Sequence, residues 1–98
     1  PTGGMPLGLF EEGAFEARTL TMSPGDLLCV YSDGITECAS PSDEEFGERR
    51  LCELLLASAA KPLGDIVAEV DTAVTRFAAG LPQGDDQTLV LLRKTGTG

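Results

Sequence analysis

The stretch of sequence that decides the fold is PGDLLCVYSDG, residues 24–34. Its middle part, Leu27 to Tyr31, is continuously apolar, which is typical of a β-strand that is covered on both faces. Pro24 and Gly25 suit the two central positions of a type II turn in front of this strand. Because Phe15 to Met22 is rich in β-compatible residues, we expect this segment to form a hairpin with the strand that follows.

A second apolar run lies near the other end of the chain, from Thr88 to Leu92. It follows the polar sequence Gly84-Asp85-Asp86-Gln87, which indicates a turn that leads into a strand. The first segment, Pro1 to Leu9, is rich in glycine and proline, so we expect an irregular loop there.

Two helical patterns separate the strands. The first carries Leu51, Leu54 and Leu55 on one face. The second begins near Pro62, and Gly80 stops it. Its apolar residues recur at spacings of three and four, namely Leu63, Ile66, Val67, Val70, Val74 and Phe77. The order strand, strand, helix, helix, strand predicts an α+β fold.

The composition restricts the function further. The chain has 98 residues, which suits a single domain, and 42% of them are hydrophobic, which suits a folded core. A net charge of −9 argues against nucleic acid as a partner. No apolar stretch is long enough to span a membrane, so we expect a cytoplasmic protein that binds no membrane. The three cysteines show no metal-site spacing, and there is no histidine, so any catalysis must depend on carboxylates.

Carboxylates lie at the ends of both predicted strands. Asp33 follows the strand over 27–31, whereas Asp85 and Asp86 precede the strand over 88–92. If these strands are antiparallel neighbours, the carboxylates meet at one sheet edge, where hard oxygen ligands suit Mg²⁺ or Mn²⁺. Asp-Gly and Gly-Asp are also ordinary turn sequences, so spacing alone favours plain turns over a metal site.

The ordered set of segments resembles the protein phosphatase 2C-like family, and specifically its stage II sporulation protein E-like bacterial branch. The resemblance runs through nearly the whole chain. It is carried by Gly4 to Leu9, by the central motif Pro24 to Glu37, by Glu45 to Leu51 and by Gly84 to Val90.

The resemblance implies part of an α-β-β-α layered sandwich with antiparallel sheets and a two-metal site for Mn²⁺ or Mg²⁺. Asp33 and Asp85 match metal ligands of the family, and Asp86 matches a less constant neighbour. Gly34 lets the backbone approach an ion, and Glu37 matches a further acidic position. The implied activity is hydrolysis of phosphoserine or phosphothreonine on a regulatory protein, such as an anti-sigma factor antagonist, by a metal-activated water without a histidine base.

One departure from the family pattern concerns an aspartate that bridges the two metals. The family places it in the first half of the domain, and no residue of this chain matches it. We therefore expect residues 1–98 to be the C-terminal half of a single phosphatase domain and to be inactive alone. We also expect a homodimer through exposed sheet edges or through burial of uncovered sheet faces. The alternative is a catalytically silent protein-interaction module of the same fold.

Overall fold

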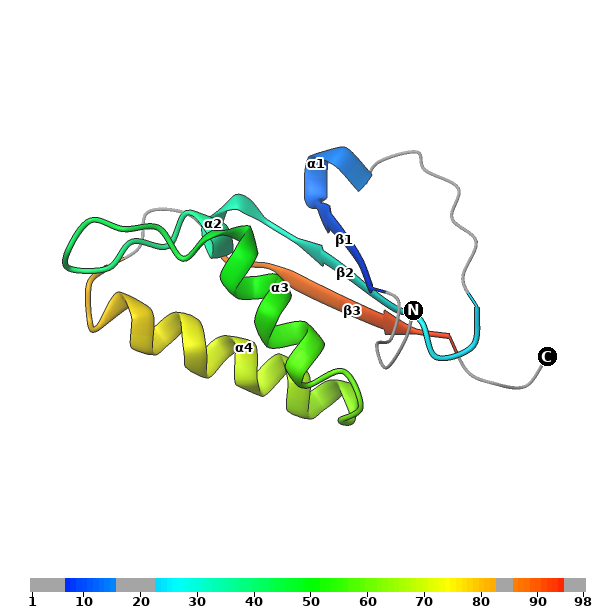
Figure 1. Cartoon of the computed structure of the whole chain (residues 1–98). Helices are drawn as coiled ribbons and strands as arrows, with labels where there is room; N and C mark the ends of the chain where they lie inside the picture. Colours follow the sequence, from blue (N-terminus) through cyan, green and yellow to red (C-terminus); the bar gives the residue numbers. More distant parts are fainter. Residues whose placement is uncertain (1–6, 16–22, 83–85, 95–98) are drawn as a thin grey trace.

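The computed structural model describes residues 7–15, 23–82 and 86–94. A three-stranded sheet forms the centre of this part of the chain, in the order β1 (Leu7–Glu11), β2 (Leu27–Tyr31) and β3 (Leu89–Arg93). The apolar run that decides the fold is a strand, as predicted, and it is the central strand of this sheet. Figure 1 shows the sheet with its helices, including the short helices α1 (Glu12–Phe15) and α2 (Asp33–Thr36).

The sheet is mixed rather than antiparallel. β3 pairs with β2 antiparallel, with Tyr31 opposite Leu89, as we expected. β1, however, pairs with β2 parallel, with Glu11 opposite Tyr31. The expectation of antiparallel sheets was wrong in this part, because the strand beside β2 comes from residues 7–11, where we expected a loop.

Gly8 explains why this strand was missed. Glycine is depleted in strands, but here a Cβ atom at Gly8 would lie 3.2 Å from Cδ1 of Leu28 and 3.3 Å from the ring of Phe10. The glycine thus leaves room for neighbours on the same face of the sheet. The glycine that argued against a strand in the sequence is thus needed for close packing within the sheet.

The predicted hairpin is confirmed only at its turn. The amide of Asp26 donates to the carbonyl of Ser23 at 3.0 Å, and Gly25 has the positive φ of 90° that a type II turn requires. Phe15 ends the helix α1 instead of beginning a strand, and residues 16–22 lie outside the described part of the chain.

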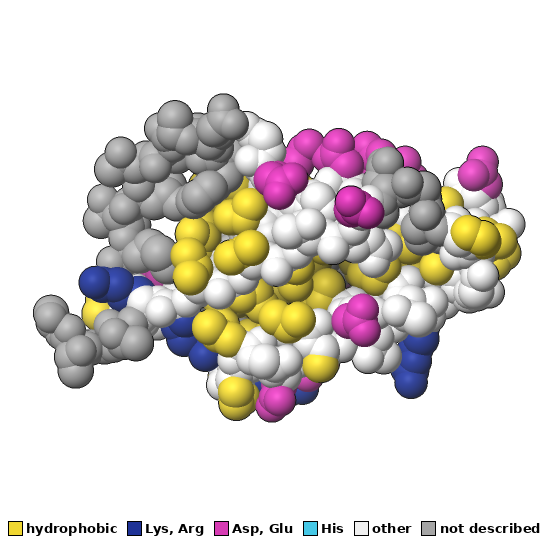
Figure 2. Space-filling view, turned by 180° about the vertical axis from the view of Figure 1, so that it is seen from behind, with side chains coloured by type: hydrophobic (Ala, Val, Ile, Leu, Met, Phe, Trp, Pro, Cys, Tyr) yellow, Lys and Arg dark blue, Asp and Glu magenta, His cyan; other side chains and the backbone are white. Residues whose placement is uncertain are grey.

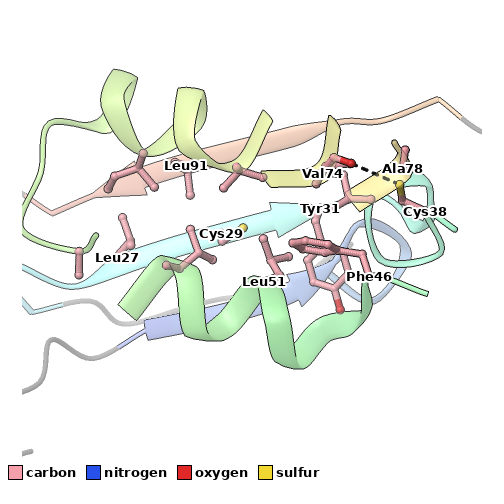
Figure 3. Close-up of a cluster of buried hydrophobic side chains, with 14 residues drawn as sticks. Leu27, Cys29, Tyr31, Cys38, Phe46, Leu51, Val74, Ala78 and Leu91 are labelled. Carbon is pink, nitrogen blue, oxygen red and sulfur yellow. Dashed lines mark hydrogen bonds between the residues drawn. The ribbon is translucent and has the colours of Figure 1, made fainter. Parts of the chain in front are cut away.

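Two helices cover one face of the sheet. α3 (Gly47–Ala57) and α4 (Leu63–Ala78) pack their apolar sides on the alternate residues Leu27, Cys29 and Tyr31 of β2. Figure 3 shows these side chains between the strands and the helices. The residues of α3 and α4 that are buried in this core are Leu51, Leu55, Ile66, Val70, Val74 and Ala78. Among the helices of the described residues, none has the length and apolar character needed to cross a bilayer.

The other face of the sheet carries apolar side chains that no helix of the described residues covers. The register places Val30 opposite Val90 and Leu28 opposite Leu92 on this face. Val90 is 47% exposed and Leu92 is 51% exposed. Figure 2 shows hydrophobic side chains gathered on the side of the molecule that faces away from the view in Figure 1. The described residues thus form one sheet with helices on one face.

Candidate metal centre

Asp33 lies two residues beyond the end of β2, in the first turn of α2. Gly34 and Ile35 are buried, whereas Asp33 is exposed, so the backbone of this turn is packed while the carboxylate stays accessible. The amide of Glu37 donates to the carbonyl of Asp33 at 2.8 Å, which closes the turn. The end of a buried strand therefore presents a carboxylate on a well-anchored backbone.

The segment before β3 lies beside this turn. The amide of Ser32 donates to the carbonyl of Thr88 at 3.0 Å, which extends the antiparallel pairing beyond Tyr31. The hydroxyl of Ser32 accepts from the amide of Thr88 at 2.8 Å and donates to the carbonyl of Asp86 at 3.1 Å. From the other side, Nε2 of Gln87 donates to the carbonyl of Gly34 at 3.3 Å.

The turn that contains Asp33 and the turn that contains Asp86, called the two acidic turns below, line one surface hollow of about 420 Å³. Asp33, Gly34 and Asp86, three of the residues predicted from the sequence, lie in its wall. Asp85, the fourth, lies outside the described residues. Glu37 is exposed and does not line the hollow. The structure therefore brings Asp33 and Asp86 to one place, and their role as metal ligands stays a prediction.

The hollow also contains acidic residues that the sequence analysis missed. Glu11 and Glu12 line it from the end of β1. Because β1 and β2 are parallel, their carboxyl ends meet at the same sheet edge, and Glu11 comes close to Asp33. Figure 1 shows α1 and α2 following these two strand ends. The sequence does contain a signal for these residues, because Glu11 and Glu12 follow the apolar pair Leu9-Phe10. A strand predicted over residues 7–11 would have placed both glutamates at its end.

Among the described residues that line the hollow, the charged side chains are all acidic. A side-chain hydrogen bond with Asp33, followed by the charge of Asp33, raises the pKa of Glu11 above its ordinary value. Loss of hydration and the charges of Glu37 and Glu48 act in the same direction with smaller effect. Glu11 therefore holds a proton more tightly than an isolated glutamate, because the proton relieves repulsion between neighbouring carboxylates.

The carboxylates that line the hollow among the described residues fit a hard divalent cation in their chemistry. Carboxylate oxygens, with retained water, are the ligands that Mg²⁺ and Mn²⁺ prefer. Within residues 7–15, 23–82 and 86–94, however, no group of three or more His, Cys, Asp or Glu side chains is arranged to hold a metal ion. Asp33, Asp86 and Glu11 thus place carboxylate oxygens around one hollow, and metal binding by them stays a prediction.

Behind the site, Tyr31 connects β2 to α3. Its hydroxyl donates to Oε2 of Glu48, in the first turn of the helix. Burial, and then this hydrogen bond and the charge of Glu48, raise the pKa of Tyr31 well above its ordinary value. Tyr31, which precedes Ser32 and Asp33, is therefore neutral and buried, and its hydroxyl is hydrogen-bonded to α3.

Comparison with known proteins gives two findings. The chain matches the family model described as Stage II sporulation protein E (SpoIIE) over residues 1–95. It is 34% identical over 89 residues to Protein IcfG of Synechocystis sp., and the match covers 89% of this chain and 14% of IcfG. The chain thus spans a small part of the length of that relative. No solved structure matches the chain significantly.

Proposed function

Because the chain belongs to the stage II sporulation protein E family, whose members are phosphatases of the protein phosphatase 2C type, we propose that it forms part of a metal-dependent protein serine/threonine phosphatase. The proposed reaction is hydrolysis of phosphoserine or phosphothreonine on a regulatory protein such as an anti-sigma factor antagonist. The observation that carries the proposal is the pair of acidic turns that hydrogen bonds hold together around one hollow.

The proposed metal ligands are Asp33, Asp85 and Asp86, with Glu11 beside them. When bound there, Mn²⁺ or Mg²⁺ would activate water and neutralise phosphoryl oxygens. The chain's own contribution is to place the carboxylates at a sheet edge and to keep the approach open to a protein substrate. A hollow lined by Glu11, Glu12, Asp33 and Asp86 repels a phosphate group when it holds no cation, so phosphate binding depends on the metal.

We propose that the uncovered face of the sheet packs against a second sheet, as the layered sandwich requires. Support comes from Val90 and Leu92, which are about half exposed although they lie in the middle of a strand and opposite apolar residues of β2. Apolar side chains at such positions gain stability when another layer covers them. In the isolated 98-residue chain, we propose that a second copy supplies this cover and that the chain forms a homodimer.

A second candidate function is a catalytically silent interaction module of the same fold. It is favoured by one observation: the carboxylates of the described residues do not form a three-ligand cluster. In that case the two acidic turns serve the fold alone, and the acidic surface binds a partner protein.

Hydrolysis of an aryl phosphate distinguishes the two functions. We expect the complete domain that contains this chain to hydrolyse it with Mn²⁺ or Mg²⁺ and to lose the activity with a chelator. The variant Asp33→Asn removes a proposed ligand charge and should reduce the rate strongly, whereas Asp65→Asn, an exposed aspartate in the first turn of α4 outside the hollow, should not. Equal rates with and without chelator would rule out the metal-dependent phosphatase.

A further inference from the structure

The contacts between the two acidic turns assign a role to two residues that carry no charge. We propose that Ser32 and Gln87 are positioning residues, which hold the turn of Asp33 and the turn of Asp86 at a set separation. The role in metal binding rests on the proposed phosphatase function. The connection itself is independent of that function, because it consists of hydrogen bonds within the chain.

The Ser32 hydroxyl holds the backbone on both sides of Gln87. It donates to the carbonyl of Asp86 at 3.1 Å and accepts from the amide of Thr88 at 2.8 Å. A hydroxyl is the smallest side chain that can do both at once, since it has one donor and two acceptor lone pairs. Alanine cannot make either bond, whereas threonine keeps the hydroxyl.

Gln87 makes the reciprocal contact, from the second turn to the first. Its Nε2 donates to the carbonyl of Gly34 at 3.3 Å, and Gly34 is buried. Gln87 therefore holds the backbone immediately after Asp33, while Ser32, immediately before Asp33, holds the backbone of Asp86. At 3.3 Å this bond lies beyond the usual range for N–H donors, so we expect Ser32 to contribute more than Gln87.

The separation of the turns matters because the metals in question tolerate little error in ligand position. Mg²⁺ demands near-octahedral geometry, and it is bound through few carboxylates. Residues that orient ligands without touching the ion typically change metal affinity by about 10- to 100-fold when they are replaced. Ser32 and Gln87 are residues of this kind, because they hold the backbone beside Asp33 and Asp86, the proposed ligands.

The test uses the 98-residue chain and two measurements on each variant. Amide hydrogen exchange by NMR reports on the Thr88 amide, which donates to the Ser32 hydroxyl. Calorimetric titration with Mn²⁺ reports on the metal. For Ser32→Ala we expect faster exchange at Thr88 and Mn²⁺ affinity lower by about 10-fold or more. Ser32→Thr should restore both, and Gln87→Met should weaken Mn²⁺ binding by a smaller factor.

Ser58→Ala is the matched control. Ser58 is buried, and its hydroxyl donates to the carbonyl of Leu54 at 2.7 Å within the helical layer. Its loss should lower stability while leaving Mn²⁺ affinity and the exchange of Thr88 unchanged. This control separates positioning of the ligands from a general loss of stability.

The outcomes separate the two proposals. Unchanged exchange at Thr88 in Ser32→Ala would overturn the positioning role, whatever the chain does with metal. Faster exchange with unchanged Mn²⁺ affinity would overturn it as well, since the turns would then move without consequence. No Mn²⁺ binding by the unmodified chain would contradict its proposed metal site, while the exchange of Thr88 would still decide whether Ser32 holds the two turns together.

Discussion

Phe77 connects the two helices, and its replacement by alanine is a quantitative test of how the helical layer is built. The ring is half-buried on α4, and it meets the ring of Phe46 edge to face with centroids 5.5 Å apart. The guanidinium of Arg50, on α3, lies 4.7 Å from the centre of the Phe77 ring. Arg50 is itself held there, because its Nη1 donates to the backbone carbonyls of Glu45 and Phe46.

The expected loss follows from these contacts. Half of the transfer free energy of a phenylalanine side chain is about 1 kcal/mol. The edge-to-face pair adds about 1 kcal/mol, and the cation–π contact adds about 0.5–1 kcal/mol. We therefore expect Phe77→Ala to lower the free energy of unfolding by about 2–3 kcal/mol, which is at or below the range for a fully buried phenylalanine.

Urea denaturation followed by circular dichroism measures this quantity. Phe77→Leu should recover about 1 kcal/mol of the loss, because it restores apolar burial but not the contacts of the ring. Glu53→Ala, an exposed residue on α3, should change stability by less than about 0.5 kcal/mol. A loss for Phe77→Ala no larger than that of the control would show that α4 does not pack on α3 through this ring.

Three further predictions concern other parts of the molecule. Tyr31 is the single tyrosine of the chain, so its ionisation can be followed by ultraviolet absorbance. Its raised pKa means that the folded chain should lose stability as the pH rises above about 10, where the unfolded tyrosine ionises. Tyr31→Phe should remove the share of this loss that is due to the tyrosine and leave the share due to the buried thiols. Burial raises the pKa of the Cys29 thiol to about 12, so iodoacetamide at pH 8 should modify the half-buried Cys52 first and Cys29 only after unfolding, as peptide mass spectrometry would show. Leu92→Lys should convert the proposed homodimer of the isolated chain into a monomer in light scattering, and an unchanged mass would exclude the uncovered sheet face as the contact.

The sequence by itself was sufficient for the elements whose pattern is local. The continuous apolar run over Leu27 to Tyr31 predicted β2, and the run over Thr88 to Leu92 predicted β3 to within one residue. The apolar period from Leu63 to Phe77 predicted α4. Each of these patterns reflects burial of one segment against the rest of the chain, and such burial is recorded in the order of side chains along that segment.

Only the tertiary structure showed which strand lies beside β2. The residues of β1, Leu7–Glu11, contain a glycine that weakens any local strand signal, and they gain their conformation by pairing with β2. That pairing is parallel, so it connects segments that no tight turn joins. The propensity of residues 7–11 alone carries no information about such a partner.

The residues of the candidate site also fall into two groups, those found from the sequence and those that only the tertiary structure revealed. Asp33 and Asp86 were found from the sequence, because each stands where an apolar run begins or ends. Glu11 was not found, since its place in the hollow depends on the parallel register of β1 with β2. The contacts of the Ser32 hydroxyl with Asp86 and Thr88 join residues that are 54 and 56 positions apart. The sequence determines which groups are available, but the distances and directions that make them a site exist only after the strands have paired.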